Sequence, residues 1–444
     1  MDEFRLPPVS ALSEVQKRFC LINLSGEYRV LDRLQSAEVL SGKRDEDISF
    51  YKKSDGELTI RRHLETLFIS SDANKIIKDF WNNPNTHVYR SIAFNPTIKN
   101  PEILNYWIPP TIIPKIGSWE NIKTFLFEII CNGHEDTFNY LYFYLAHMLQ
   151  KPEDKPGVMI VMLGSQGVGK GAFFNLLRNV WSKTTLQVSD VDHVLGNFNS
   201  QLERHYIICM DEALFSGDKK SMERLKSLIT EKVCRIEAKY QPARIISSCH
   251  RFFAASNNDH FANIERDDRR FLVLRVSSGK QGQSKYFESL FESINNENEL
   301  SAMMYELIHV DISGFDIRKR PKTQEHTEQV IRSLSGFDRY WFHVLQIGSI
   351  DTKYPSNYEW QGPIFFSSRK MSEYYLLFNR NAERYATFQS HLIKKTLEKF
   401  CPSSFPDRKQ ENGSQERGWS FPSLAMARQE FEIAIGNALD WSGD

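Results

Sequence analysis

The pattern of hydrophobic and polar positions is most informative between residues 155 and 325. Three short apolar runs, 157–163, 206–210 and 252–255, each end in polar residues, and a helical pattern at 172–181 follows the first run. A continuous apolar run of this length is typical of a strand that is buried on both faces of a parallel sheet. Such sheets bind their ligands beyond the carboxyl ends of the strands. The pattern therefore predicts an α/β domain at 155–325 whose functional residues follow these runs.

Two regions of different character precede this domain. Residues 1–115 have a weak, mixed α+β pattern. Its clearest elements are two strand-like pieces and one helical stretch, at 19–24, 28–31 and 73–81. Residues 116–154 contain two helical patterns joined by the turn residues Asn132 and Gly133, and we expect them to form a helical collar. These two helices are predicted at 119–131 and 136–150.

Residues 326–444 form the last predicted region, which follows a helical stretch at 285–309. Two more helices are expected, at 372–378 and 387–400. The second has a basic face and an apolar face, made of His391, Lys394, Lys395 and Lys399 and of Ile393, Leu397 and Phe400 respectively. With the polar segment between Gly413 and Gly418 as a wing, this pattern predicts a small winged-helix-like DNA-binding domain. The alternative is a lysine-rich face that is only solvated.

The composition is that of an ordinary globular protein with room for more than one core. The 444 residues include 41% hydrophobic and 25% charged residues, which predicts two or three domains and not a disordered chain. Basic and acidic residues are balanced at 56 each, so any contact with nucleic acid must come from local patches.

The spacing of the cysteines and the lack of long apolar segments predict that the protein is located in the cytoplasm. The six cysteines stand singly, with no C-x-x-C pair, which argues against a zinc ribbon and against a disulfide framework. The first ten residues lack a basic and then apolar leader, and no run approaches the roughly 20 apolar residues of a membrane span. We therefore expect a cytoplasmic protein with reduced thiols and no membrane partner.

The first apolar run leads into a glycine-rich loop. Its residues, Gly164-Ser165-Gln166-Gly167-Val168-Gly169-Lys170, fit the pattern G-x-x-x-x-G-K, with a helical pattern behind them. Such loops hold triphosphates, because the glycines let backbone N–H groups turn inward and the lysine adds a positive charge. We therefore expect residues 164–171 to bind ATP. The alternative is a strand-to-helix turn that binds no ligand.

The other two runs end in groups that suit phosphoryl transfer to water. Asp211 and Glu212 follow the second run, and Asn257 follows the third. Gly171 stands where Ser or Thr usually offers Mg²⁺ a hydroxyl, so the metal is expected to depend on Asp211, water and the phosphates. Glu212 is expected to polarise the attacking water, and Asn257 to sense the γ-phosphate or orient that water. Taken alone, the acidic pair is typical of a solvated loop and Asn257 of a turn.

A basic segment, Arg266 to Arg270, follows the third run. Either Arg269 or Arg270 could reach the nucleotide of a neighbouring subunit and act in trans, which would make activity depend on a ring. The alternative is a surface ion-pair cluster with Asp267 and Asp268.

A hairpin is predicted between the second and third runs. Two β-prone stretches, 233–236 and 244–246, flank a segment that contains Lys239 and Tyr240. At the tip of a hairpin, this lysine would offer a cation to a phosphate backbone and the tyrosine a ring to a base. The alternative is an ordinary exposed turn.

The order of these motifs resembles that of phage- and plasmid-type primase-helicases of helicase superfamily 3. The matching segments are Gly164 to Gly171, Phe198-Asn199, Met210-Asp211-Glu212-Ala213, Leu225 to Glu231, Glu237-Ala238-Lys239, Ser256-Asn257 and Asp268-Arg269-Arg270-Phe271. The likeness extends from about residue 20 to about residue 435 and is densest between Pro152 and Val276.

The resemblance implies an AAA+-like P-loop ATPase that forms a hexameric ring and translocates on single-stranded DNA to unwind a duplex. The residues to which it assigns roles are Lys170 for phosphate, Asp211 and Glu212 for Mg²⁺ and water, Asn257 as polar sensor, Lys239 for DNA, and Arg269 or Arg270 as the trans-acting arginine. Members of this family often have glycine at the position of Gly171.

Together these features predict an ATP-dependent DNA helicase of phage or mobile-element replication that acts on single-stranded or forked DNA. Relatives commonly have a primase domain upstream, but the only tight acidic cluster in the first hundred residues is Asp45-Glu46-Asp47, with no serine-x-histidine element after it. We therefore expect a stand-alone helicase, or one whose primase or polymerase is a separate polypeptide. The alternatives are a nucleotide-gated nucleic-acid-binding or phage-defence ATPase that does not unwind, and a small-molecule kinase.

Overall fold

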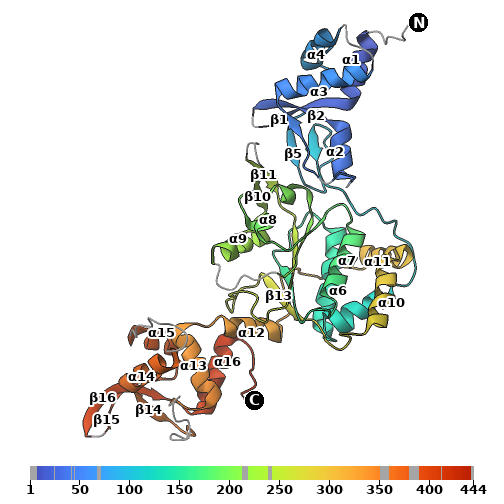
Figure 1. Cartoon of the computed structure of the whole chain (residues 1–444). Coiled ribbons are helices and arrows are strands. Elements are labelled where there is room, and N and C mark those ends of the chain that lie inside the picture. Colours follow the sequence, from blue (N-terminus) through green and yellow to red (C-terminus); the bar gives the residue numbers. More distant parts are fainter. Residues whose placement is uncertain are drawn as a thin grey trace. The chain divides into compact units, whose positions relative to one another are not determined.

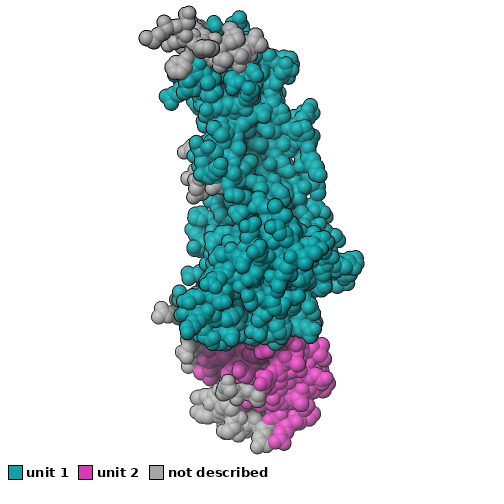
Figure 2. All heavy atoms as spheres, turned by 90° about the vertical axis from the view of Figure 1, so that its right-hand side faces the viewer, with its two compact units in different colours: residues 1–261, 269–321 teal, residues 262–268, 322–444 magenta. Residues whose placement is uncertain are grey.

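The computed structural model describes residues 8–24, 26–41, 43–44, 46–67, 72–212, 219–238, 243–350, 360–379, 390–411 and 413–441. The chain divides into two compact units, coloured separately in Figure 2. Unit 1 consists of residues 1–261 and 269–321, and unit 2 of residues 262–268 and 322–444. Among the helices that the structure describes, none is long and apolar enough to cross a membrane.

The first part of unit 1, drawn in blue in Figure 1, is a mixed α+β region. Its elements are α1 (Pro8–Arg18), β1 (Phe19–Leu24), β2 (Glu27–Asp32), α2 (Arg33–Leu40), β3 (Phe50–Tyr51), α3 (Lys53–Thr66), α4 (Ala73–Asn82), β4 (Val88–Tyr89), β5 (Ser91–Ala93) and β6 (Ile103–Asn105). One sheet has the strand order β3-β2-β1-β4, and its core includes Phe19, Ile60 and Phe80. The two strands and the helix predicted for this region are confirmed.

The middle of unit 1 is a five-stranded parallel sheet with helices. Its elements are β7 (Met159–Leu163), α7 (Lys170–Val180), β8 (Thr185–Val188), α8 (Asp192–Leu195), the 3₁₀ helix η2 (Ser200–Arg204), β9 (Ile207–Met210), α9 (Lys219–Thr230), β10 (Val233–Ile236), β11 (Arg244–Ser247), β12 (Arg251–Ser256) and β13 (Phe271–Arg275). The strand order is β13-β7-β12-β9-β8, and each neighbouring pair is parallel. All residues of β7, β9 and β12 are buried. The predicted parallel α/β sheet is therefore confirmed.

The order of the strands brings the ends of β7, β9 and β12 together. The strand β12 lies between the other two, with Ala255 beside Met162 of β7 and Ala254 beside Met210 of β9. Because all three strands run in the same direction, the residues after them lie at one edge of the sheet. A backbone hydrogen bond of 3.2 Å from Gly164 N to Ser256 O joins two of these ends.

Helices from two parts of the sequence pack beside the sheet. They are α5 (Glu120–Thr124), the π-helix η1 (Phe125–Ile130), α6 (Glu135–Gln150), α10 (Ser284–Asn295) and α11 (Glu297–His309). The helix predicted at 119–131 is present as α5 followed directly by η1. Its second half has π geometry, in which Cys131 N donates to the carbonyl of Leu126, five residues back, at 3.0 Å. The stretch predicted at 285–309 is two helices, since Asn296 caps the second by accepting from Asn298 N.

Unit 2 combines helices with a small antiparallel sheet. Its elements are α12 (Gln324–Arg332), α13 (Gly336–Ile347), β14 (Ile364–Ser367), α14 (Ser368–Asn379), α15 (Ser390–Phe400), β15 (Phe405–Glu411), β16 (Ser414–Phe421) and α16 (Leu424–Ile435). The strand order is β14-β16-β15. The helix predicted at 372–378 begins four residues earlier, at Ser368, and the first residues of the one predicted at 387–400 lie outside the described residues.

A buried lysine stands just before β7. Lys155 is 4% exposed, and its ammonium donates to the Oγ of Ser248, which in turn lies 2.8 Å from Nδ1 of His250. Desolvation by burial lowers the pKa of Lys155 to about 7 and that of His250 to about 3. No carboxylate forms an ion pair with Lys155 among the ion pairs of the described residues.

We predict that the free energy of unfolding rises with pH between about 7 and 8.5, because the pKa of Lys155 is lower in the folded state than in the unfolded chain. The folded state gives up this proton near pH 7 and the unfolded chain keeps it to the usual value of 10.5, so the unfolded state binds more protons in this window. The slope contributed is at most about 1.4 kcal/mol per pH unit. Urea denaturation across this range should give a flatter profile for Lys155→Met, whereas Lys75→Met, at an exposed site, should keep the wild-type slope. Equal slopes for all three proteins would contradict the assignment.

Candidate functional site

The loop at 164–169 connects β7 to α7 and is shaped by its glycines. Gly167 has φ +80° and Gly169, which precedes the first helical residue, has φ +112°, a region that favours glycine. A Cβ on Gly169 would lie 3.1 Å from a ring carbon of Phe125, so the backbone approaches its neighbours closely there. A loop of this form, followed by a helix N-terminus, presents backbone N–H groups to an anion.

Lys170 lies at the centre of the candidate site. It begins α7 and is 8% exposed. Its ammonium donates three hydrogen bonds, to the carbonyl oxygens of Gly164 (2.6 Å) and Ser165 (2.8 Å) and to Oδ1 of Asn257 (2.9 Å). The structure therefore joins the glycine-rich loop to the end of β12 through one side chain.

Asp211 and Glu212 follow β9 at the same edge of the sheet. The Asp211 carboxylate accepts a hydrogen bond from Gln187 Nε2 at 3.1 Å, and the backbone N–H of Asp211 donates to Val188 O at 2.8 Å. Burial lowers the pKa of Lys170, and the negative charges of Asp211 and Glu212 oppose that shift. The structure thus brings the predicted lysine and both predicted carboxylates within electrostatic range of one another.

An open, polar cleft of about 340 Å³ adjoins the loop. It is lined by Gly164, Ser165, Asn257, Asp259, Arg275 and Ser277, among others. Arg275, the last residue of β13, forms an ion pair of 2.5 Å with Asp259. Sequence reasoning missed this cation, although its position at the end of the apolar run 271–276 was a usable signal.

Gly171 has open space around it. No heavy atom outside its immediate neighbours would lie within 4 Å of a Cβ built there. The missing hydroxyl at this position is therefore not a result of crowding.

The predicted basic segment is divided between the two units. Arg269 is exposed, whereas Arg270 is half-buried and its backbone carbonyl accepts from Met159 N at 2.7 Å. Within unit 2, Arg266 pairs with Asp267 at 3.7 Å, so part of the alternative ion-pair cluster is present.

The predicted hairpin is formed by β10 and β11, which pair antiparallel from Val233 with Ser247 to Ile236 with Arg244. Lys239 and Tyr240 lie outside the described residues.

The helix α15 has the two faces expected of it. Ile393, Leu397 and Phe400 are buried, and the basic residues Lys394, Lys395 and Lys399, with His391, are exposed. Lys394 lies 3.6 Å from Glu398, and Lys399 lies 3.8 Å from Asp338.

Unit 2 has a second basic feature, which was not predicted from the sequence. Arg408 of β15 and Arg417 of β16 are exposed and directly opposite each other across the ladder. The pairs on either side of them on the same face are uncharged: Gln410 with Gln415, and Pro406 with Trp419. Like charges in this position repel, so this face of the hairpin suits an anionic partner. The period-2 pattern of 405–421 was the signal that could have revealed it.

The chain combines a five-stranded parallel α/β sheet with a glycine-rich loop between a strand and a helix, which is consistent with the core of a P-loop protein. A model of a family of unknown function (DUF5906) matches residues 162–270. The DNA primase-polymerase of Nitratiruptor phage NrS-1 is 26% identical over 232 residues, which are 49% of this chain and 32% of that protein. The chain thus matches about a third of the length of this relative. The predicted likeness to phage primase-helicase proteins is confirmed.

Solved structures of the NrS-1 C-terminal region share the fold. Two apo structures of it cover 94% of this chain and 100% of their own chain, with TM-scores of 0.60 and 0.61 and 16% identity. A JCV helicase structure covers 52% of this chain at a TM-score of 0.29 and 13% identity, which is too low to support an inference.

We predict opposite effects on stability for two glycines of the loop. Gly171→Ala should stabilise the fold by about 0.5–1 kcal/mol, because the site is open and alanine is the better helix former. Gly169→Ala should destabilise it by more than about 1 kcal/mol, because alanine is strained at φ +112° and would press on Phe125. Urea denaturation of both variants tests this, and the reverse order would mean that the loop is built differently.

Proposed function

We propose that the chain is an ATP-dependent DNA helicase of phage or mobile-element replication, of the AAA+-like superfamily 3 type. The observation that carries the proposal is the junction at Lys170, whose ammonium binds the loop carbonyls and Asn257 while the charges of Asp211 and Glu212 act on it. A loop lysine, a carboxylate pair and an amide at neighbouring strand ends are the groups that phosphoryl transfer to water requires. The likeness to a phage primase-polymerase supports a role in replication.

The residues present fit ATP with Mg²⁺. Residues 164–171 would hold the phosphates through backbone N–H groups, and Lys170 would exchange its carbonyl partners for phosphate oxygens. Asp211 would hold Mg²⁺, which neutralises charge on the phosphates when bound. Glu212 would accept a proton from the attacking water, and Asn257 would orient that water. Gln187 fixes the Asp211 carboxylate by its 3.1 Å hydrogen bond.

We further propose a ring, with a hexamer as the expected size. The exposure of Arg269 favours it over Arg270 as the group that reaches the nucleotide of a neighbouring subunit. Single-stranded or forked DNA would contact Lys239 and Tyr240 of the hairpin and Lys394, Lys395 and Lys399 of α15. The arrangement of α13, β14, α14, α15 and the β15–β16 hairpin supports a winged-helix-like region.

The proposed domains are an N-terminal mixed region at 1–115, a collar at 116–154, the ATPase at 155–325 and the winged-helix-like region at 326–444. A primase or polymerase is proposed to act as a separate partner. A nucleotide-gated nucleic-acid-binding or phage-defence ATPase remains the alternative outcome: ATP turnover stimulated by single strands, without separation of a forked duplex, would favour it.

We predict that Lys170→Ala lowers ATP turnover by at least roughly 10²-fold, because it removes the positive charge placed for the β- and γ-phosphates. The measurement is phosphate release with and without single-stranded DNA, together with unwinding of a forked duplex. Lys75→Ala, on an exposed face of α4, should behave as wild type. Turnover at the wild-type rate in Lys170→Ala would remove this loop from the site.

Complementation between two inactive variants tests the trans-acting arginine. Lys170→Ala and Arg269→Ala should each be nearly inactive, with a loss of about 10²-fold or more for the arginine. A mixture should regain activity, because a subunit with intact Lys170 can then lie beside one with intact Arg269. The same mixture with Arg270→Ala serves as the comparison. If both arginine variants on their own hydrolyse ATP at the wild-type rate, no arginine of this segment acts in trans.

A further inference from the structure

A short segment that precedes β9, the strand followed by the two carboxylates, makes side-chain contacts with the β10–β11 hairpin. We name residues 199–204 the clamp segment; it consists of Asn199 and the 3₁₀ helix η2, and β9 begins three residues after it, at Ile207. Two of its side chains, those of Asn199 and Glu203, are 2% and 3% exposed. Both point to the base of the β10–β11 hairpin.

Asn199 holds the first strand of the hairpin by its backbone. Its Oδ1 accepts from Glu237 N at 2.9 Å, and its Nδ2 donates to Arg235 O at 3.0 Å. Its own backbone N–H donates to Glu237 O at 3.2 Å. Both the oxygen and the nitrogen of the Asn199 amide group are therefore hydrogen-bonded to backbone groups at the end of β10.

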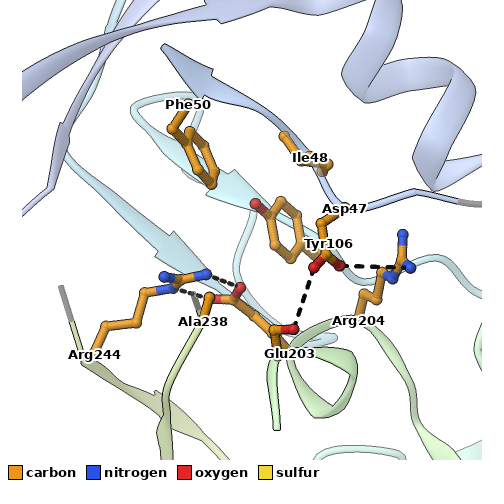
Figure 3. Close-up of a pocket in the computed structure, with 9 residues that line it drawn as sticks. Asp47, Ile48, Phe50, Tyr106, Glu203, Arg204, Ala238 and Arg244 are labelled. Atoms are coloured by element: carbon orange, nitrogen blue, oxygen red, sulfur yellow. Dashed lines mark hydrogen bonds and ion pairs between the residues drawn. The ribbon is translucent and has the colours of Figure 1, made fainter. Parts of the chain in front are cut away.

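Glu203 holds the second strand. Both of its carboxylate oxygens accept from the guanidinium of Arg244, the first residue of β11, through Nε and Nη2 (Figure 3). Burial raises the pKa of Glu203, and Arg244 opposes this by its hydrogen bonds and charge. A paired, two-point contact of this kind fixes orientation as well as distance.

The other side of the clamp segment contacts the N-terminal region. Ser200 Oγ donates to Asp47 Oδ2 at 3.3 Å, and Arg204 Nη1 donates to Glu46 O at 2.8 Å. The side chains of Phe50 and Tyr106 line the same small pocket as the Glu203–Arg244 pair (Figure 3).

The pairing of the two hairpin strands does not involve the clamp segment. Its two strands pair with each other over four residue pairs, from Val233 with Ser247 to Ile236 with Arg244. The contacts of Asn199 and Glu203 instead fix where the hairpin stands relative to β9, which ends directly before Asp211.

We infer that Asn199 and Glu203 are positioning residues that couple the β10–β11 hairpin to the carboxylates at the end of β9. The inference rests on the proposed function, in which the hairpin contacts DNA and the carboxylates serve ATP hydrolysis. Movement of β9 on a change of nucleotide is then passed to both strands of the hairpin through the clamp segment.

The first test measures hairpin mobility and needs no ATP chemistry. A spin label on Ile245→Cys, at a β11 position that is 71% exposed, reports on the hairpin, since the six native cysteines are buried. Asn199→Ala should raise the mobility of the label. Asn105→Ala is the matched control, because its amide makes the same kind of backbone contacts, to Asn95 and Ile98, in the N-terminal region. An unchanged spectrum in Asn199→Ala would overturn the inference, whatever the activity of the protein.

The second test measures coupling in the full chain. Asn199→Ala and Arg244→Gln should reduce the stimulation of ATP turnover by single-stranded DNA by about tenfold, with the basal rate and the KM for ATP within about twofold of wild type. The double variant Glu203→Gln with Arg244→Gln, which restores a neutral hydrogen-bonded pair, should recover part of the stimulation. A proportional loss of basal and stimulated rates would make the clamp segment a stability element only. If wild type shows no stimulation by DNA while the label responds as expected, the helicase proposal fails and the positioning role stands.

Discussion

The hydrogen bonds of the Lys170 ammonium are the constraint on which the rest of the structure depends. A buried cation needs oxygen partners, and here they come from two carbonyls of the loop and from Asn257, which follows β12. This geometry requires the loop to fold back over the strand edge and requires β7 and β12 to be neighbours. The buried, parallel strands meet that requirement, because their direction and register place the ends of β7, β9 and β12 at one edge.

The central strands of the parallel sheet could be predicted from the sequence, because they are completely buried. Every residue of β7, β9 and β12 is buried, so the apolar runs identify them without reference to the rest of the chain. The edge strand β8 was not identified, because Val188 is its only buried residue, while Thr185 and Leu186 are half-buried and Gln187 is exposed. The π geometry of η1 was not predicted, because a run of apolar residues such as 125–130 does not distinguish a π-helix from an α-helix.

Part of the candidate site could likewise be predicted from the sequence, and part could not. The loop, Asp211 and Asn257 follow strands directly, and their positions could be predicted from local pattern. The roles of Gln187, Arg275 and Glu203 depend on partners that are close only in the folded chain, at 24, 16 and 41 residues of sequence separation. Asn199 belonged to a matching motif, yet its contacts with the hairpin backbone could not be derived from the motif alone.

Two residues beside the candidate site have strained backbone conformations. Among the described residues, the non-glycine positions with positive φ are Asn132 (+50°) and Glu212 (+54°). Asn132 lines the cleft beside the loop, and Glu212 follows the carboxylate that is expected to hold the metal. Asparagine accepts this conformation readily, but glutamate rarely does, so Glu212 is held there by its surroundings, including the 3.2 Å bond from its N–H to Asp211 Oδ1. A change at Asp211 would release that bond and free the backbone of Glu212, the residue proposed to accept a proton from the attacking water.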